Sequence, residues 1–144
     1  MHVAAVLKRK GNRIVSAAPD DTVAAVTRLL TEHRIGAVLV MDDDGQPVGI
    51  LSERDIVRAV ARDSAAALDR RAADLMTRDL ITAAPTDTVA DMMAVMTERR
   101  IRHVPIVDAG RVVGVISIGD VVKARIDDAE LEVESLRGYV AGMG

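Results

Sequence analysis

The chain has 144 residues, of which 49% are hydrophobic and 28% charged, and its formal net charge is −3. This balance is typical of one folded domain of ordinary size and excludes a disordered chain. The acidic charge and the single aromatic residue, Tyr139, argue against nucleic acid as a partner, since such binding needs clustered cations and stacking platforms. The absence of cysteine excludes disulfides and thiolate chemistry and fits a reducing compartment.

No stretch approaches the roughly 18 consecutive apolar residues that span a bilayer. The first segment has a short apolar run, Val3–Leu7, followed by the basic run Lys8–Lys10, which is the wrong order for a signal peptide. We therefore expect a cytoplasmic protein without membrane contact.

The sequence contains an internal repeat. Residues 15–38 return 66 positions later as residues 81–104, with Pro19 matching Pro85. After a one-residue deletion in a turn, the offset becomes 65. Such dense identity indicates two similar units, and two copies suit packing about a pseudo-twofold axis.

Each unit is expected to begin with a strand and a helix. The β-prone segments Ile14–Ala17 and Leu80–Ala83 run into Ala-Pro, and proline disfavours the helical conformation in the residue before it. Asp21 and Asp87 are the expected N-caps of the helices that follow, whose apolar residues recur at helical spacing.

Two strands and a second helix complete each unit, which gives the order β-α-β-β-α. The second helix begins at Ser52 or Ser117, and a turn separates the two strands before it. The strands are expected at Ala37–Met41 and Val48–Leu51 in the first unit, and at Val104–Val107 and Val112–Ile116 in the second. The predicted fold class is α/β, of the α+β type.

We divide the chain into a first repeat with an N-terminal segment (1–61), a linker (62–78), a second repeat (79–125) and a C-terminal helical extension (126–144). Apolar residues recur in the extension at 3-4-3-4 spacing, which suits packing on a partner helix. The same seam could instead fold back on its own domain, and the spacing does not separate these alternatives. Its members are Ile126, Ala129, Val133, Leu136 and Val140.

Both units carry the motif G-h-h-S-x-x-D, where h is apolar, at the junction of a strand and a helix. Unpaired backbone N–H groups at such a junction suit a polar ligand. A Ser followed three residues later by an Asp is also what a capping box requires, and capping alone accounts for the motif. A carboxylate there can equally hold the hydroxyls of a ribose. The two copies are Gly49, Ser52 and Asp55, and Gly114, Ser117 and Asp120.

In combination with P-x-D-T-V and the strand opening I-x-x-h-P-h-V, this motif resembles the CBS domain over residues 13–60 and 79–125. Two tandem copies form a Bateman module, as in stand-alone bacterial CBS-pair proteins. The resemblance implies a non-catalytic regulatory sensor that binds AMP, ADP, ATP, NAD(H) or S-adenosylmethionine in two clefts between the repeats. AMP is the first expectation, as a ligand and not as a catalytic cofactor. A homodimer and an unidentified regulated protein are the implied partners.

The resemblance also implies which residues bind the nucleotide in each cleft. Each cleft would combine the ribose-binding aspartate of one unit with the segment that enters the other unit. The first set is Ile50, Ser52 and Asp55 with Thr77, Leu80 and Ile81, and the second is Val115, Ser117 and Asp120 with Arg13, Ile14 and Val15. The positions that face the phosphates are Gly36, Ala37, Arg102 and His103.

The two clefts are predicted to differ in the residues that could bind a phosphate. Arg54 precedes Asp55, whereas Gly119 precedes Asp120. Arginine suits phosphate because its hydrogen bonds are charge-assisted. Arg102 could equally be a solvated surface charge, and His103 a polar residue at a sheet edge.

Other classes of site find little support in the sequence. The histidines lack the spacing of a zinc site, and the turn at 42–45 lacks the glutamate that a calcium loop needs at its twelfth position. No nucleophile and base form a recognisable pair, so neither an enzyme nor a metal site is expected. The competing interpretation is a structural dimerisation scaffold without any nucleotide response.

Overall fold

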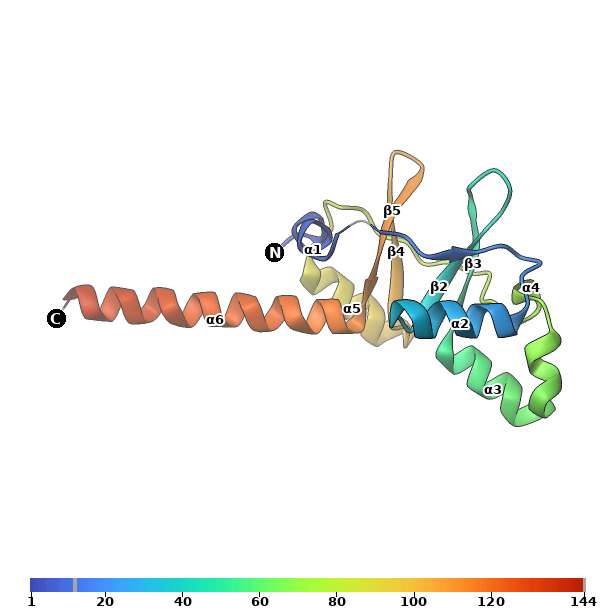
Figure 1. Ribbon diagram of the computed structural model, residues 1–144. Helices are drawn as coiled ribbons and strands as arrows, with labels where there is room; N and C mark the ends of the chain where they lie inside the picture. The colour runs from blue at the N-terminus through green and yellow to red at the C-terminus, as the bar shows by residue number, and fades with distance from the viewer. Residues whose placement is uncertain (12, 144) are drawn as a thin grey trace.

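A computed structural model of the chain describes residues 1–11 and 13–143. It has the expected α+β architecture of two repeats, whose hairpins stand side by side while the last helix projects away from them (Figure 1). The first repeat contains β1 (Ser16–Ala17), α2 (Val23–His33), β2 (Ala37–Met41), β3 (Pro47–Ser52) and α3 (Glu53–Asp63). The second contains α5 (Val89–Arg99), β4 (His103–Asp108), β5 (Arg111–Ser117) and α6 (Ile118–Met143). The remaining elements are α1 (Val3–Lys10), η1 (Ser64–Asp69) and α4 (Ala72–Leu75).

The expected N-caps were wrong by one residue. The caps of α2 and α5 are Thr22 and Thr88, whose hydroxyls accept from the backbone N–H of the residue three positions later, at 3.1 Å in both cases. Asp21 and Asp87 instead accept from the N–H of the residue three positions earlier, at 2.8 Å. The aspartates thus hold the turn that follows the proline, and the threonines begin the helices.

The two sheets differ in one strand. In the first repeat, β1 pairs in parallel with β2, with Ser16 opposite Leu39. In the second repeat, the expected strand Leu80–Ala83 is reduced to an isolated bridge between Ala83 and Ile106. Pro105 stands where the first repeat has Leu39, and because proline has no N–H, the parallel ladder loses a donor there.

The segment before each repeat packs on the other repeat. The N–H of Val3 in α1 donates to Asp87 O at 2.8 Å, and the N–H of Ala72 in α4 donates to Asp21 O at 2.7 Å. Residues of α1 accordingly belong to the core of the second repeat, and Ala72 and Met76 belong to the core of the first. This exchange follows the pseudo-twofold relation between the repeats. The sequence pattern did not predict a helix at the α1 segment.

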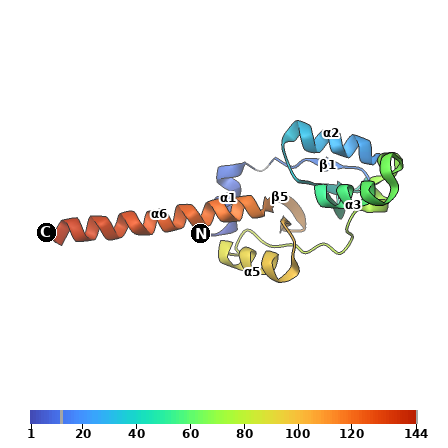
Figure 2. The ribbon, with the colours of Figure 1, turned by 90° about the horizontal axis from the view of Figure 1, so that it is seen from below.

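The last helix does not fold back on the domain. Its first turns bury Val121 and Ala124, but every residue from 129 to 140 is exposed. Figure 2 shows from below that α6 extends away from the two repeats. No helix within the described residues is long and apolar enough to cross a membrane.

Candidate functional site

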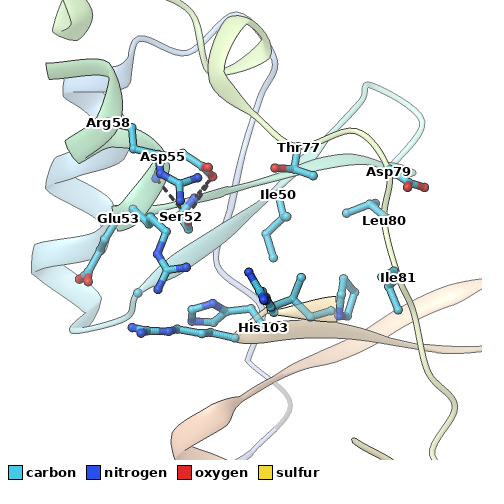
Figure 3. A pocket seen from close by; sticks show the side chains of 16 residues that line it. Ile50, Ser52, Glu53, Asp55, Arg58, Thr77, Asp79, Leu80, Ile81 and His103 are labelled. Carbon is cyan, nitrogen blue, oxygen red and sulfur yellow. Dashed lines mark hydrogen bonds between the residues drawn. The ribbon is translucent and has the colours of Figure 1, made fainter. Parts of the chain in front are cut away.

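A cavity of about 430 Å3 lies between the repeats and is lined by residues of both. Its walls come from the end of β3 and the start of α3 on one side, and from the linker end and the start of β4 on the other (Figure 3). The structure therefore brings together ten of the sequence-predicted binding residues. These are Gly36, Ile50, Ser52, Arg54, Asp55, Thr77, Leu80, Ile81, Arg102 and His103.

Asp55 forms the capping box considered for it in the sequence, and it also lines the cavity. Its Oδ2 accepts from the backbone N–H and the hydroxyl of Ser52, each at 2.9 Å, and the Asp55 N–H donates to Ser52 Oγ at 3.3 Å. The capping box is therefore present. Among the described residues, the hydrogen bonds to this carboxylate all reach Oδ2, while Asp55 also lines the cavity. Its second oxygen is thus left for a ligand hydroxyl.

Three apolar side chains line the cavity. Leu80 and Ile81 lie at the end away from Asp55, with Asp79 next to Leu80, and Ile50 lies between them and Ser52, as Figure 3 shows. The backbone N–H and C=O of Ile50 are both bonded to Thr77, at 3.0 and 2.9 Å. A planar base at this end would therefore meet apolar side chains and not free backbone groups of Ile50.

The motif glycine is required by packing. A Cβ on Gly49 would lie 3.0 Å from Thr77 O and 2.5 Å from Met76 Sδ. Only a residue without a side chain allows the linker to pass this close to β3. The glycine thereby lets Thr77 reach Ile50 and close the back of the cavity.

The cavity is also lined by cations of both repeats. Arg54 and Arg102, from different repeats, both line it, as do Arg58 and Arg100. Sequence reasoning missed the last two. Arg58 follows Arg54 at i+4 and so lies on the same helix face, a signal that could have been used. Arg100 ends α5 in the left-handed conformation, with φ of 55°, which the sequence did not reveal.

Two acidic residues and two apolar ones also line the cavity without having been predicted. Glu53 lies at the start of α3, and Asp79 lies in the linker just before Leu80. Their carboxylates partly offset the arginines and favour a ligand with separate polar and charged parts. The two apolar residues are Ile101 and Pro105.

His103 lies where the two repeats meet. A Cβ on Gly36 would be 3.2 Å from His103 Nε2, so the ring occupies space that any larger residue at position 36 would take. Burial, followed by the charge of Lys10, lowers the pKa of His103 below its ordinary value of 6.5, against the opposing effects of Glu53 and Asp120. The imidazole is therefore neutral at neutral pH.

In the second repeat, Lys10 lies beside Asp120, the aspartate that corresponds to Asp55. Ser117 and Asp120 form the same hydrogen bonds as Ser52 and Asp55, with Asp120 Oδ2 accepting from the N–H and the hydroxyl of Ser117 at 2.9 Å. Lys10 Nζ donates to the same Oδ2 and to Val115 O, both at 2.7 Å. Burial by itself raises the pKa of Asp120, but the hydrogen bonds from Lys10 and Ser117 outweigh it and lower the pKa.

The remaining predicted residues do not line this cavity. Ala37 is buried in β2, and Arg13 Nη2 lies 2.6 Å from His33 Nδ1. Ile14 and Val15 are partly buried on the way into β1. In the second predicted set, Lys10 Nζ bonds Val115 O and Asp120 Oδ2, and Asp120 Oδ2 also accepts from Ser117 N–H. The structure thus brings the first predicted set together and places α1 against the aspartate of the second.

The fold and the cavity define a class of protein, a pair of β-α-β-β-α repeats with an inter-repeat cleft. The sequence profile of the CBS domain matches residues 5–62 and 72–127. The chain belongs to the family of proteins with paired CBS domains.

Solved and curated proteins of this family are similar to the chain over most of its length. The CBS-domain protein ATU1752 of Agrobacterium tumefaciens is 44% identical with a TM-score of 0.84, covering 86% of this chain and 92% of that one. The CBS-domain protein PAE2072 of Pyrobaculum aerophilum, solved in complex with AMP, is 35% identical with a TM-score of 0.74, covering 83% and 89%. The mitochondrial CBSX3 of Arabidopsis thaliana is 35% identical over 127 residues, which are 85% of this chain and 62% of that protein.

Proposed function

We infer that the chain is a non-catalytic sensor of an adenosine nucleotide, with AMP as the preferred ligand, and that the nucleotide binds in the cavity beside Asp55. The observation that carries this inference is the combination of chemistry in one cavity: apolar side chains, a carboxylate and arginines of both repeats all line it. A volume of about 430 Å3 falls within the range of small-molecule sites. The AMP complex of PAE2072 supports the same ligand class.

The proposed binding mode follows from these three kinds of lining residue. The adenine would lie among Ile50, Leu80 and Ile81, where apolar contact is the main source of affinity. The ribose hydroxyls would donate to the free oxygen of Asp55. The phosphate would then point toward Arg54 and Arg102, which can pair with it through charge-assisted hydrogen bonds. Because arginines of both repeats line the cavity, an anionic nucleotide is favoured over the cationic S-adenosylmethionine.

Sensing requires that the ligand prefer one arrangement of the two repeats. A nucleotide in this cavity touches α3 of the first repeat and β4 of the second at once. Its binding would therefore stabilise their relative placement, and a regulated protein that contacts both repeats could read the change. The stabilisation grows with ligand concentration above the dissociation constant.

The test is calorimetric titration and thermal unfolding with AMP, ADP, ATP, NADH, S-adenosylmethionine and adenosine. We expect AMP to raise the melting temperature, and Asp55→Ala to weaken AMP binding by roughly 10- to 100-fold, the cost of a charge-assisted hydrogen bond. Asp55→Ala also removes a helix cap, so Asp91→Ala is the matched control: Asp91 forms the same capping box with Thr88 outside the cavity.

Two outcomes would reject the proposal. One is that none of these compounds changes the melting temperature at millimolar concentration. The other is that Asp55→Ala and Asp91→Ala leave AMP affinity equally unchanged, which would remove the ribose role from Asp55.

A further inference from the structure

The last helix, α6, has two apolar faces, and only one is used inside the chain. Val121 and Ala124 are buried in the second repeat. One turn further along the same face, Asp127 pairs with Arg9 at 2.9 Å and Asp128 pairs with the N-terminal ammonium at 3.5 Å. These contacts fix the side of α6 that faces α1 and leave the opposite side free.

The opposite side carries a continuous apolar stripe, here called the α6 seam: Val122, Ile126, Ala129, Val133, Leu136 and Val140. Its larger members are between 45% and 68% exposed. The seam is about 27 Å long at 1.5 Å per residue. A contiguous exposed stripe of this kind marks an interaction surface.

Nothing else in the described chain supports the outer part of this helix. Residues 129–140 are all exposed, and Figures 1 and 2 agree that the helix leaves the domain with no element beside it. A helical segment of about a dozen residues is marginally stable in water by itself. The core-packed first turns remove the cost of nucleation, and a partner along the seam would supply the remaining stability.

The seam has the heptad pattern of a two-stranded coiled coil. Counting Ile126 as position a puts β-branched residues at every a position of the seam, with Val133 and Val140 as the others. Leu136 falls at position d. β-Branched residues at a with leucine at d favour two parallel strands.

The charges beside the seam select the orientation. Flanking positions g and e carry Arg125 and Glu132, and Glu130 and Arg137, respectively. In a parallel pair, each g residue faces the e residue five positions later on the other chain, so that Arg125 meets Glu130 and Glu132 meets Arg137. Both contacts join opposite charges.

An antiparallel pair with full overlap would place like charges opposite each other. There, e residues face e residues and g residues face g residues, so Glu130 and Glu132 would each oppose their own copies. Lys123 would oppose Arg137. Every charged contact would then be repulsive, which disfavours this arrangement.

From the free seam, the heptad pattern and these charges, we propose that two copies of the chain associate through the α6 seam as a parallel two-stranded coiled coil. The occupant of the seam is a second copy, because α6 supplies both charge partners of each contact. The contact lies outside the nucleotide cavity, so it can fail or hold independently of nucleotide binding.

The first experiment is sedimentation equilibrium of the full chain at tens of micromolar. We expect a dimer for the unmodified chain and a monomer for the double variant Val133→Asp, Leu136→Asp. The matched control is Leu131→Asp: Leu131 is 55% exposed but lies off the seam, so this variant should remain dimeric. A monomeric unmodified chain, or a dimer that survives the double substitution, overturns the proposal.

The second experiment tests orientation by cross-linking. Because the chain has no cysteine, Val140→Cys introduces a single thiol. A parallel pair brings the two Cys side chains together, and oxidation should yield a disulfide-linked dimer, whereas Leu131→Cys should not. If instead only a mixture of Val122→Cys and Val140→Cys chains cross-links, the helices are antiparallel and the parallel arrangement is overturned.

The third experiment exchanges charges. Arg137→Glu should weaken association roughly fivefold by placing like charges at Glu132. Adding Glu132→Arg to the same chain restores opposite charges and should restore the dimer. Failure of the double variant to regain the affinity lost by the single one would overturn the assigned pairing.

Discussion

Lys10 Nζ lies 2.7 Å from Asp120 Oδ2 and pairs with this carboxylate, whereas the equivalent Asp55 forms no ion pair with another described residue. The same ammonium bonds Val115 O, at the position that Ile50 holds in the first repeat. In the first repeat, Ile50 O accepts from Thr77 N–H instead. The extra helical turn Lys8–Lys10 of α1 therefore distinguishes the two repeats at the point where their sites would be alike.

We predict that removing this lysine opens a second binding event. The unmodified chain should bind about one AMP, and Lys10→Met should bind a second one, because Asp120 loses the cation that satisfies it. Stoichiometry from calorimetric titration measures this. Arg9→Met is the control, since Arg9 pairs with Asp127 outside the site. An unchanged stoichiometry in Lys10→Met would show that the lysine does not close this position.

The Lys10–Asp120 pair should also give a defined pH dependence of stability. The folded-state pKa of Asp120 is lowered, so the pair stabilises the fold above the unfolded-state pKa of about 3.9 and this contribution is lost as the pH falls through the folded-state value. Urea unfolding of the unmodified chain and of Asp120→Asn should therefore differ at neutral pH, and this difference should shrink as the pH falls below about 3.9. A difference that persists undiminished at acid pH would contradict this assignment.

His103 should couple AMP binding to proton uptake. Its pKa is lowered by burial and by Lys10, so it is neutral before the ligand arrives. A phosphate nearby favours the charged imidazolium, which raises the pKa and draws a proton from solution. Calorimetry in buffers with different ionisation enthalpies measures the proton.

The controls for this proton are a variant and a ligand. The uptake should be smaller in His103→Gln, and it should be absent for adenosine, which has no phosphate. Equal uptake by the unmodified chain and His103→Gln would assign the proton to another group.

The two motif glycines should differ in their tolerance of a side chain. A Cβ at Gly49 meets backbone, Thr77 O at 3.0 Å, whereas a Cβ at Gly114 meets only side-chain atoms of Leu7, the nearest at 2.5 Å. A leucine side chain can move, but the linker backbone is held by its bonds to Ile50. Gly49→Ala should therefore cost about 1–3 kcal/mol, and Gly114→Ala less. Guanidinium unfolding of both variants would check the order, and a larger cost at position 114 would contradict it.

The internal repeat was sufficient to predict the hairpins and the two helices of each repeat, but not α1 or α4. Ala37–Met41 was predicted with its exact bounds, and the other three hairpin strands to within one residue at either end. The reduced strand near Ala83 was missed, although Pro105 was visible in the sequence at the position where a donor was needed. The capping role of Thr22 was missed because Asp21 is an equally good cap by residue type, and only the local geometry separates them.

The candidate site was less accessible to sequence reasoning. The residues around Asp55 were predicted as a group and do gather in one cavity, but the convergence of Arg58 and Arg100 with Arg54 depends on how two helices from different repeats meet. The role of Lys10 was not foreseen. It depends on a helix whose apolar partners lie in the other repeat, so no local pattern points to it.

Because α1 packs on the second repeat and α4 packs on the first, the two repeats form one folding unit. Val3 is bonded to Asp87, a residue 84 positions later, so α1 has no core to join until the second repeat has been synthesised. Contacts this distant raise the entropic cost of the folding nucleus and slow its formation. Cutting the chain within the linker would leave each half without the helix that closes its core, and neither half would be expected to fold by itself.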